Sequence, residues 1–400
     1  MCSVALVCGE YAITRPTSNA LFLTIFSFKT YPWVWLATVP LNLQVIYLYN
    51  KFLPKIGPKL AIFWLAIATL SINTATGLLF PIFPQIIFLQ FAWKDIYVLL
   101  MLKQVWSMIH STIAPASAKY LYGCIYAVGT VGAISGSLIP SFLAITMGSE
   151  QILLLTFPLY LLLMASYAAA FRRSPLKNGA FEEKLTPDPR PSEAFALIRR
   201  TPILLAVLLL VIFMQVSVAL AEYRFNAHLE LNILDKNLRT AYCGQLSGLI
   251  NTLSLIFQFL GSYLLVKMLG LKRSHFVVPV LLFCAVLISL IFPTFAVISL
   301  SYVFLKAIDF SLFGVIREML YVPLQLDAKF RAKAIIDVFT YRTSKALVSF
   351  GLLGLQIVGS IYLLDYIGYV SLFVFVAWLV TVRILYKNMG HSTTSTAVPL

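Results

Sequence analysis

The chain has 400 residues, of which 60% are hydrophobic and only 11% are charged, and its mean hydropathy is +0.90. Soluble domains carry about 25% charged residues, so these values exclude a water-soluble globular protein and indicate a membrane protein. A formal net charge of +15 would suggest a nucleic-acid partner in a soluble chain, but membrane topology also gathers Lys and Arg on one face. The net charge therefore indicates a partner only once each charged residue has been assigned to one side of the membrane.

Membrane-spanning helices are predicted from apolar runs that are bounded by charged residues, Pro or Gly, because about 20 mostly apolar residues cross the hydrocarbon core. Twelve segments fit: 1–14, 31–50, 60–80, 95–113, 120–146, 151–171, 201–221, 241–266, 276–292, 295–314, 336–360 and 365–386. The first is short and is followed by Arg15 and Pro16, so we expect it either to continue as a bent helix through Phe28 or to lack a few upstream residues. It has no basic n-region or small-residue cleavage site, and we therefore keep it as part of the fold.

The basic residues of the loops predict the orientation of the chain. If the N-terminus is inside, twenty Lys and Arg side chains fall on the cytoplasmic side and six on the other side. The positive-inside rule then places both termini and the loop 172–200 in the cytoplasm of an integral, multi-pass protein, and we expect a bacterial inner membrane. Nearly all of the positive excess is explained by topology, so we expect the bilayer, and no nucleic acid, as a partner.

The loop 172–200 is the one long polar stretch, and it separates the twelve spans into six and six. The segments that begin at Tyr47 and Tyr263 also resemble each other, since each has an apolar helix end, a short basic loop with one Gly, and a new helix. These features predict an all-α membrane protein with about 12 transmembrane helices in two six-helix halves, which is the major facilitator-like plan. The predicted domains are a first half 1–171, a linker 172–200, a second half 201–390 and a polar tail 391–400. By analogy of fold, the substrate site would lie at the midplane between the halves.

Several kinds of chemistry are not indicated by the motifs. The sequence has no GxxxxGK[ST] phosphate loop, which argues against ATP hydrolysis and favours a secondary carrier. The five cysteines form no CxxC pair and the four histidines form no HExxH motif, so no metal site is expected. No nucleophile and general base occur in an arrangement that suggests hydrolysis or acyl transfer. We therefore predict no catalytic residue and no cofactor, and we do not expect an enzyme.

Charged residues inside the predicted spans are the main candidates for a binding site, because a charge near the bilayer centre is costly unless it meets a partner or a watery cavity. Lys103, with Gln104 beside it, has no acidic residue within helical reach and is predicted to line the cavity, the alternative being an ion pair with another helix. Lys306 and Asp309 are three residues apart and lie on one helix face. The two side chains could form a structural ion pair with each other, or they could contact the substrate.

The eleventh predicted span contains a second group of polar residues. Asp337 and Tyr341 share a face by their spacing, while Arg342 and Lys345 lie together on an adjoining face. Two cations without an acidic residue at helical spacing suit an anionic ligand, although an interhelical salt bridge is equally open. Asp337 also lies four residues after Lys333, so it could instead form an ion pair at the cytoplasmic mouth.

Two further patterns have structural interpretations. Gly129, Gly132 and Gly136 form a stripe on one helix, which predicts close packing of two membrane helices rather than a phosphate cradle. The charged residues close to predicted span ends are expected to reach the interface by snorkelling. These are Glu10, Arg15, Glu222 and Arg224.

The segment 304–349 resembles the signature of the ATP:ADP antiporter, or nucleotide transporter, family of intracellular bacteria and plastids. The residues in matching order and spacing are Ser311-Leu312-Phe313, Glu318-Met319, Tyr321-Val322-Pro323-Leu324, Lys329, Lys333-Ala334, Asp337-Val338 and Lys345. A second resemblance lies in 118–122, just before the glycine stripe. The sequence departs from the family at Gly314-Val315, where the signature has Asp-Pro, and at Val34, which stands where the translocases carry an intramembrane lysine.

The resemblance implies a divergent secondary transporter of nucleotides that works by ATP/ADP exchange or by nucleotide–proton symport. The predicted substrate contacts are Lys103, Gln104, Lys306, Tyr341, Arg342 and Lys345. The predicted gating or proton-coupling residues are Asp309, Asp337 and Glu318. The alternatives are a major-facilitator symporter of another small anionic metabolite and a non-transporting membrane receptor or scaffold. The sequence leaves the oligomeric state open.

Overall fold

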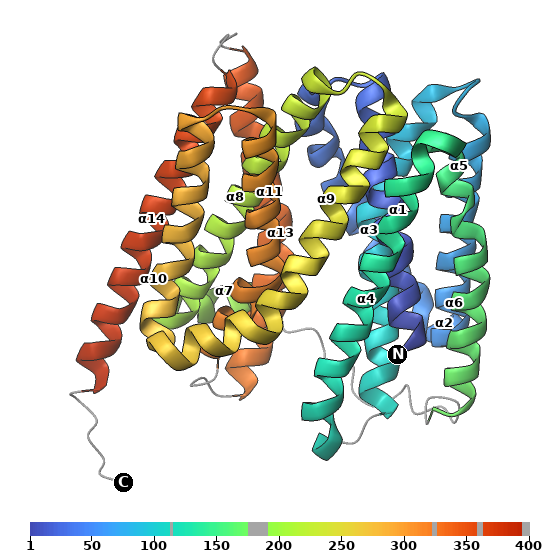
Figure 1. Ribbon diagram of the computed structural model, residues 1–400. Coiled ribbons are helices and arrows are strands. Elements are labelled where there is room, and N and C mark those ends of the chain that lie inside the picture. The colour runs from blue at the N-terminus through green and yellow to red at the C-terminus, as the bar shows by residue number, and fades with distance from the viewer. Residues whose placement is uncertain (113–114, 175–190, 322–325, 358–362, 394–400) are drawn as a thin grey trace. The chain divides into compact units, whose positions relative to one another are not determined.

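The computed structural model describes residues 1–112, 115–174, 191–321, 326–357 and 363–393, and its secondary structure is helical in all of these ranges (Figure 1). Nine segments of the described chain are long and apolar enough to cross a membrane. The chain divides into two compact units. Unit 1 consists of Met1–Leu185 and Leu229–Thr252, and unit 2 of Thr186–His228 and Leu253–Leu400. We describe each unit by itself.

Unit 1 is a helix bundle, and its helices from α1 to α6 are coloured from blue to green in Figure 1. Its elements are α1 (Cys2–Ile25), η1 (Phe28–Thr30), α2 (Tyr31–Leu79), η2 (Pro84–Ile86), α3 (Ile87–Thr112), α4 (Pro115–Met147), α5 (Ser149–Leu154) and α6 (Thr156–Arg172). The first helix, α1, packs against α3, α4, α5 and α6 and so lies inside the bundle. The apolar core around it includes Val7, Tyr97, Met101 and Tyr160.

The first helix is longer than the predicted span 1–14. It continues through Pro16 and ends at Ile25. Proline is tolerated inside membrane helices because neighbouring groups satisfy the backbone that it leaves free. Glu10 therefore lies in the interior of the 24-residue helix α1 instead of near its end.

In each unit a long helix is interrupted by a sharp turn at a glycine with an unusual backbone conformation. In α2 the helical geometry is interrupted at Gly57, with φ 74° and ψ 164°. In α10 (Ser262–Ile291) the interruption is at Gly270, with φ 73° and ψ 163°. This region of backbone space is essentially restricted to glycine. The two loops that resemble each other in sequence thus also turn in the same way, and each separates two of the predicted spans.

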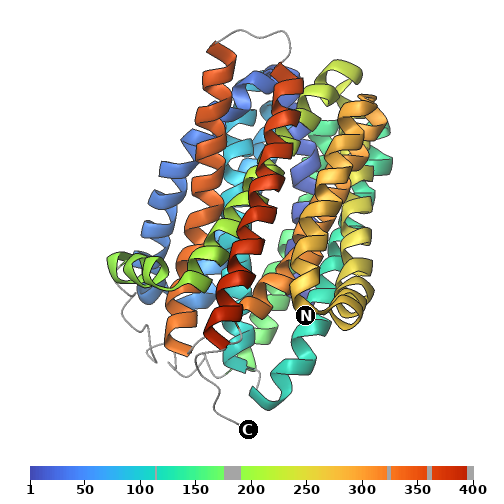
Figure 2. The same cartoon turned by 90° about the vertical axis from the view of Figure 1, so that its left-hand side faces the viewer.

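Unit 2 contains the green to red helices of Figure 1. Besides α10, its elements are α7 (Pro191–Arg200), α8 (Pro202–Asn232), the end of α9 (Lys236–Ile256), η5 (Phe257–Gly261), α11 (Phe295–Ile308), η6 (Asp309–Phe313), α12 (Gly314–Leu320), α13 (Leu326–Ile357) and α14 (Leu363–Thr393). Both η5 and η6 are single π-helical turns. The amphipathic α7 packs on α13 and lies across the direction of the long helices (Figure 2). The core includes Val207, Met214, Phe313 and Trp378.

The end of α8 and most of α9 belong to unit 1 because polar and close contacts hold them there. Glu230 accepts a hydrogen bond of 2.5 Å from the backbone N–H of Phe28. The Oγ of Ser149 lies 2.8 Å from Thr240 Oγ1 and donates to Asn237 Oδ1 at 2.8 Å. These bonds connect the end of α8 to η1 and the start of α9 to the start of α5.

Candidate functional site

Lys306 is a buried cation in unit 2. Its side chain on α11 is 3% exposed, and its Nζ lies 3.1 Å from Oε2 of Glu222 on α8. The same nitrogen lies 5.9 Å from the ring centroid of Tyr302 and 5.8 Å from that of Phe310. A buried ion pair is costly to desolvate, and replacing one partner leaves an uncompensated charge. The sequence had offered Asp309 as a partner for Lys306, whereas the structure gives it a carboxylate from another helix.

Asp309 starts the π turn that follows Lys306. Its Oδ1 accepts a hydrogen bond of 3.2 Å from Nε2 of Gln215 on α8. The π turns η5 and η6 are in contact, since a β-carbon at Gly261 would lie 3.2 Å from Leu312 Cδ2. Single π turns within helices occur frequently at functional sites. Lys306 and Asp309 therefore lie at an irregular point of the bundle that also receives polar side chains from α8.

The expectation that Glu222 and Arg224 snorkel to the interface is wrong. Both side chains are only 6% exposed. Arg224 donates from Nη1 to Ser289 Oγ at 2.7 Å and from Nη2 to the Ser289 carbonyl at 2.9 Å. The predicted span ended at residue 221, but α8 continues to Asn232. The absence of Pro and Gly from 222–232 was the sequence signal for this longer helix.

Lys103 and Gln104 have different surroundings in unit 1. Lys103 is exposed, and its Nζ donates to Asn50 Oδ1 at 3.3 Å. Gln104 is 1% exposed and donates from Nε2 to the Pro58 carbonyl at 3.1 Å and to Tyr167 OH at 3.3 Å. These bonds attach Gln104 to the turn of α2 at Gly57 and Pro58. The geometry is that of a structural contact, and the role of Gln104 in binding stays a prediction.

The remaining candidates lie on α12 and α13. Lys345 is half-buried on α13, and Glu318 lies 3.7 Å from Arg317. The side chains of Asp337, Tyr341 and Arg342 lie outside the described part of the structure. The predicted grouping of Arg342 with Lys345 therefore stays a prediction.

The glycine stripe lies against α1. A β-carbon at Gly132 would overlap the carbonyl oxygen of Ala5, and one at Gly136 would overlap that of Gly9. A β-carbon at Gly129 would lie 3.0 Å from Val4. The backbones of α1 and α4 thus approach each other where only glycine leaves room, as small residues allow in membranes.

A buried polar cluster surrounds Glu10, which is 2% exposed. Its Oε1 accepts from Thr14 Oγ1 at 2.5 Å and from Asn73 Nδ2 at 3.2 Å, and its Oε2 accepts from Tyr97 OH at 2.7 Å. The interfacial position predicted for Glu10 is wrong, because α1 continues past Arg15 and Pro16. The signal that could have revealed the cluster is an acidic residue followed four positions later by Thr within an otherwise apolar helix.

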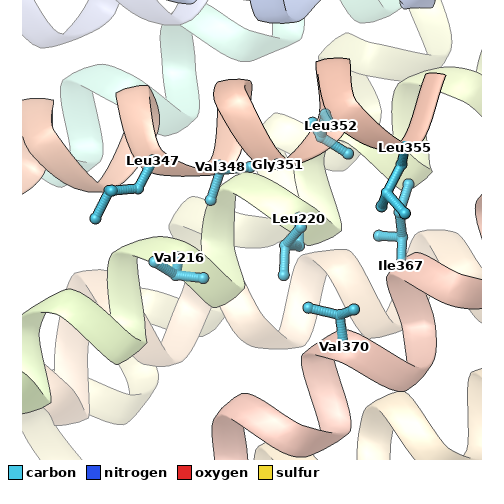
Figure 3. A pocket seen from close by; sticks show the side chains of 9 residues that line it. All are labelled: Val216, Leu220, Leu347, Val348, Gly351, Leu352, Leu355, Ile367 and Val370. Carbon is cyan, nitrogen blue, oxygen red and sulfur yellow. The ribbon is translucent and has the colours of Figure 1, made fainter. Parts of the chain in front are cut away.

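A cavity of about 310 Å³ lies in unit 2 between α8, α13 and α14 (Figure 3). Aliphatic side chains and one glycine line it: Val216, Leu220, Leu347, Val348, Gly351, Leu352, Leu355, Ile367 and Val370. It offers no polar group to an anion, so it is not the site that the charged residues would form. Within the described residues, no group of three or more His, Cys, Asp or Glu side chains is placed to hold a metal ion.

The fold is that of a transporter. The chain superposes on the nucleoside transporter NupG with a TM-score of 0.63 at 12% identity, covering 96% of this chain and 98% of NupG. It superposes on a bacterial homologue of the iron transporter ferroportin with a TM-score of 0.64 at 15% identity, with 96% and 98% covered. Both are major facilitator-like structures, and likeness at this identity shows the fold alone. Together with the apolar helices, this likeness indicates an integral, multi-pass membrane protein with a major facilitator-like fold.

The sequence comparisons give the family. The model described as "TLC ATP/ADP transporter" matches residues 172–389, more than half of the chain. The ADP,ATP carrier protein 1 of Chlamydia pneumoniae is 28% identical over 220 residues, 49% of this chain and 42% of the carrier. The carrier of the same name from Chlamydia muridarum is 27% identical over 228 residues, 51% and 43%. The protein belongs to the TLC ATP/ADP transporter family, and its matched region spans less than half the length of these curated relatives.

Proposed function

We propose that the protein is a secondary active transporter of nucleotides that works by alternating access, through ATP/ADP exchange or nucleotide–proton symport. The observation that carries this proposal is the buried Lys306–Glu222 pair, which lies inside the region that the nucleotide transporter family matches. A nucleotide needs cations for its phosphates, and a buried lysine is a point charge that phosphate oxygens bind well. Lys103, Arg342 and Lys345 are proposed as further phosphate contacts.

Glu222 would compete with the substrate for Lys306. In the structure the carboxylate of Glu222 lies 3.1 Å from the Lys306 Nζ and neutralises the buried lysine. A phosphate group that reaches Lys306 replaces one anion by another, so the cation never stands alone in the low-dielectric interior. Such an exchange of partners makes substrate entry and release reversible, which a carrier requires.

We also propose the predicted topology. Helix α2 contains two predicted spans, 31–50 and 60–80, on either side of the turn at Gly57, and the turn at Gly270 in α10 lies between the predicted spans 241–266 and 276–292. Division of Phe28–Leu79 at Gly57 raises the nine apolar segments of the described chain to ten, and α1 and α13 would supply the other two. We therefore propose twelve spans in a first half 1–171 and a second half 201–390, with the linker 172–200 and both termini in the cytoplasm. The basic residues near Gly57 and Gly270 would then face a bacterial inner membrane from the cytoplasmic side.

The proposal is tested by uptake into proteoliposomes of labelled ATP and ADP. We expect saturable uptake, and we expect Lys306→Gln to raise the half-saturation concentration about tenfold or more, because a charge-assisted contact is lost. Lys267→Gln is the matched control, since Lys267 is exposed and bonded to Tyr263 OH at 3.0 Å. Uptake that requires internal nucleotide indicates exchange, and uptake driven by an imposed proton gradient indicates symport. Absence of saturable uptake of any nucleotide above protein-free liposomes would refute the proposal.

A further inference from the structure

Glu10 carries a buried carboxyl group in the unit 1 bundle, and the proposed substrate contacts give this group no role. It is 2% exposed, and its partners Thr14, Asn73 and Tyr97 are each fully buried. They come from α1, α2 and α3. An ionisable residue inside a membrane protein, facing the bundle interior, is by default a hypothesis of function.

The hydrogen bonds around Glu10 form an oriented chain. Gln90 Nε2 donates to Asn73 Oδ1 at 2.8 Å, which directs the amide nitrogen of Asn73 to Glu10 Oε1 at 3.2 Å. The same nitrogen also donates to Thr156 Oγ1 on α6 at 3.0 Å. Four helices of unit 1 therefore contribute to this cluster, and its donors are aimed at the carboxylate.

The side chains that donate hydrogen bonds to Glu10 are neutral hydroxyl and amide groups. The phenols of Tyr97 on α3 and Tyr160 on α6 face the carboxylate. On the elements packed around it, the other titratable groups with described side chains are Cys2, Cys8, Tyr11, Arg15, Tyr31, Tyr47, Tyr49, Lys51, Lys55, Lys59, Lys94, Asp95, Lys103, His110, Tyr122, Cys124, Tyr126, Glu150, Tyr167 and Arg172. Among the described residues, no Lys or Arg nitrogen lies within 4.0 Å of the Glu10 carboxylate.

Both charge states of Glu10 can be accommodated by the same cluster. The ionised carboxylate accepts from Thr14, Asn73 and Tyr97, but it is a buried charge without a cation at contact distance, which is unfavourable. The protonated form removes the charge and needs one acceptor for its O–H. The Thr14 and Tyr97 hydroxyls can rotate and accept, because a hydroxyl both donates and accepts.

We propose that Glu10 is a proton-binding site that couples proton movement to transport. The step is a simple protonation: an O–H bond forms at a carboxylate oxygen, the charge of the side chain changes from −1 to 0, and the proton leaves again to water. The inference deepens the proposed function and rests on it, because it supplies the proton site of a nucleotide–proton symporter.

The position of Glu10 also suits coupling to helix movement. Gly9, its neighbour in sequence, is where α1 meets Gly136 of α4 with no room for a side chain. On its other side α4 contacts α9, since β-carbons at Gly244 and Gly248 would each lie 2.9 Å or less from an atom of Ser141 or Ser137. A change in the hydrogen bonds of α1 at Glu10 thus acts beside the contact that fixes α1 on α4.

The first test is independent of transport. Infrared difference spectra of the reconstituted full-length protein, titrated with pH, should contain the C=O band of a protonated carboxyl group that is lost in Glu10→Gln. Asp95→Asn is the matched control and should keep the band, because Asp95 accepts a hydrogen bond from Tyr11 and lies 3.9 Å from Lys94. A spectrum unchanged by Glu10→Gln overturns the proposal, whatever the substrate of the protein is.

The second test uses labelled ATP as the probe. We expect Glu10→Gln to lose uptake driven by an imposed proton gradient while it retains exchange of external for internal ATP. Loss of both activities together with retained folding, or proton-driven uptake that persists, contradicts a coupling function. Dependence on sodium instead of protons also contradicts it. If the wild-type protein moves no nucleotide, the proposed function fails while the infrared titration still decides the proton site.

A second variant covers the case in which Glu10→Gln does not fold. Tyr97→Phe removes one donor to the ionised carboxylate and keeps the carboxyl group. The midpoint at which the carboxyl band appears should then move to higher pH by about one unit, because a hydrogen bond to a charged group is lost. An unchanged midpoint would overturn the proposal.

Discussion

Gly136 on α4 lies against the backbone carbonyl of Gly9 on α1, so closely that a β-carbon at position 136 would overlap that oxygen. By contrast, a β-carbon at Gly123 on the same helix would meet nothing within 4 Å. The two glycines thus differ only in what faces them, which makes them a matched pair for experiment.

Gly136→Ala is expected to lower the free energy of unfolding by about 1–3 kcal/mol, because backbone atoms of α1 have to move. Gly123→Ala should be neutral or slightly stabilising, since alanine is the better helix former. Thermal unfolding in detergent measures both. Equal effects of the two substitutions would mean that α1 and α4 do not pack as described.

Because Lys306 and Glu222 form an ion pair, the losses of stability caused by substituting each of them are expected to be non-additive. Lys306→Gln or Glu222→Gln alone leaves one buried charge without its ion-pair partner and should cost about 3–5 kcal/mol. The double variant should recover most of this stability, because both charges are gone. It should remain defective in nucleotide uptake. Additive losses in the double variant would argue against a direct interaction between the two side chains.

Substitution of Gly57 or Gly270 is expected to strain the backbone at these turns. Alanine at either position has to adopt a positive φ and should cost about 1–3 kcal/mol. Gly354→Ala is the control, because Gly354 lies within helix α13 and a β-carbon there meets nothing within 4 Å. Unfolding midpoints of the three variants decide the matter, and a turn variant as stable as Gly354→Ala would contradict the described backbone.

Substitution of Ser149 is expected to remove hydrogen bonds between α5 and α9. It is fully buried, and its Oγ interacts with Lys236 O at 3.2 Å as well as with Asn237 and Thr240. Ser149→Ala should lower stability by about 1–2 kcal/mol, since buried hydrogen bonds of about 1 kcal/mol each are lost. Thr130→Ala should cost less, because Thr130 is exposed and bonds only its own helix. A smaller loss for Ser149→Ala than for Thr130→Ala would count against the contact between α5 and α9.

The sequence predicts much of the helical fold because apolar length and loop charge are local properties. Gly57 and Gly270 could be predicted as turn residues, since a basic loop with a single glycine has few other ways to reverse a helix. Helix ends were less predictable. Pro16 looked like a break but is accommodated within α1, and α8 extends eleven residues beyond its predicted end at residue 221.

Those errors at helix ends determined which site residues were missed. Glu10 and Glu222 were assigned to the interface because the predicted helices stopped near them, and a charge at a helix end can reach water. The partners of Lys306 and Glu10 come from other helices, at sequence separations of 84 for Glu222 and 63 for Asn73. Periodicity along one helix carries no information on such contacts.

The π turns η5 and η6 change the angular register of the helices in which they occur. A π turn accommodates one extra residue, and one residue corresponds to about 100° of rotation around an α-helix. Residues before Asp309 and after Phe313 therefore cannot be assigned to a common face by counting threes and fours. The angular positions of Lys306 and Glu318, for example, differ by this additional rotation. In a helical-wheel analysis or cysteine scan of 295–320, the angular positions therefore have to be counted anew from Gly314.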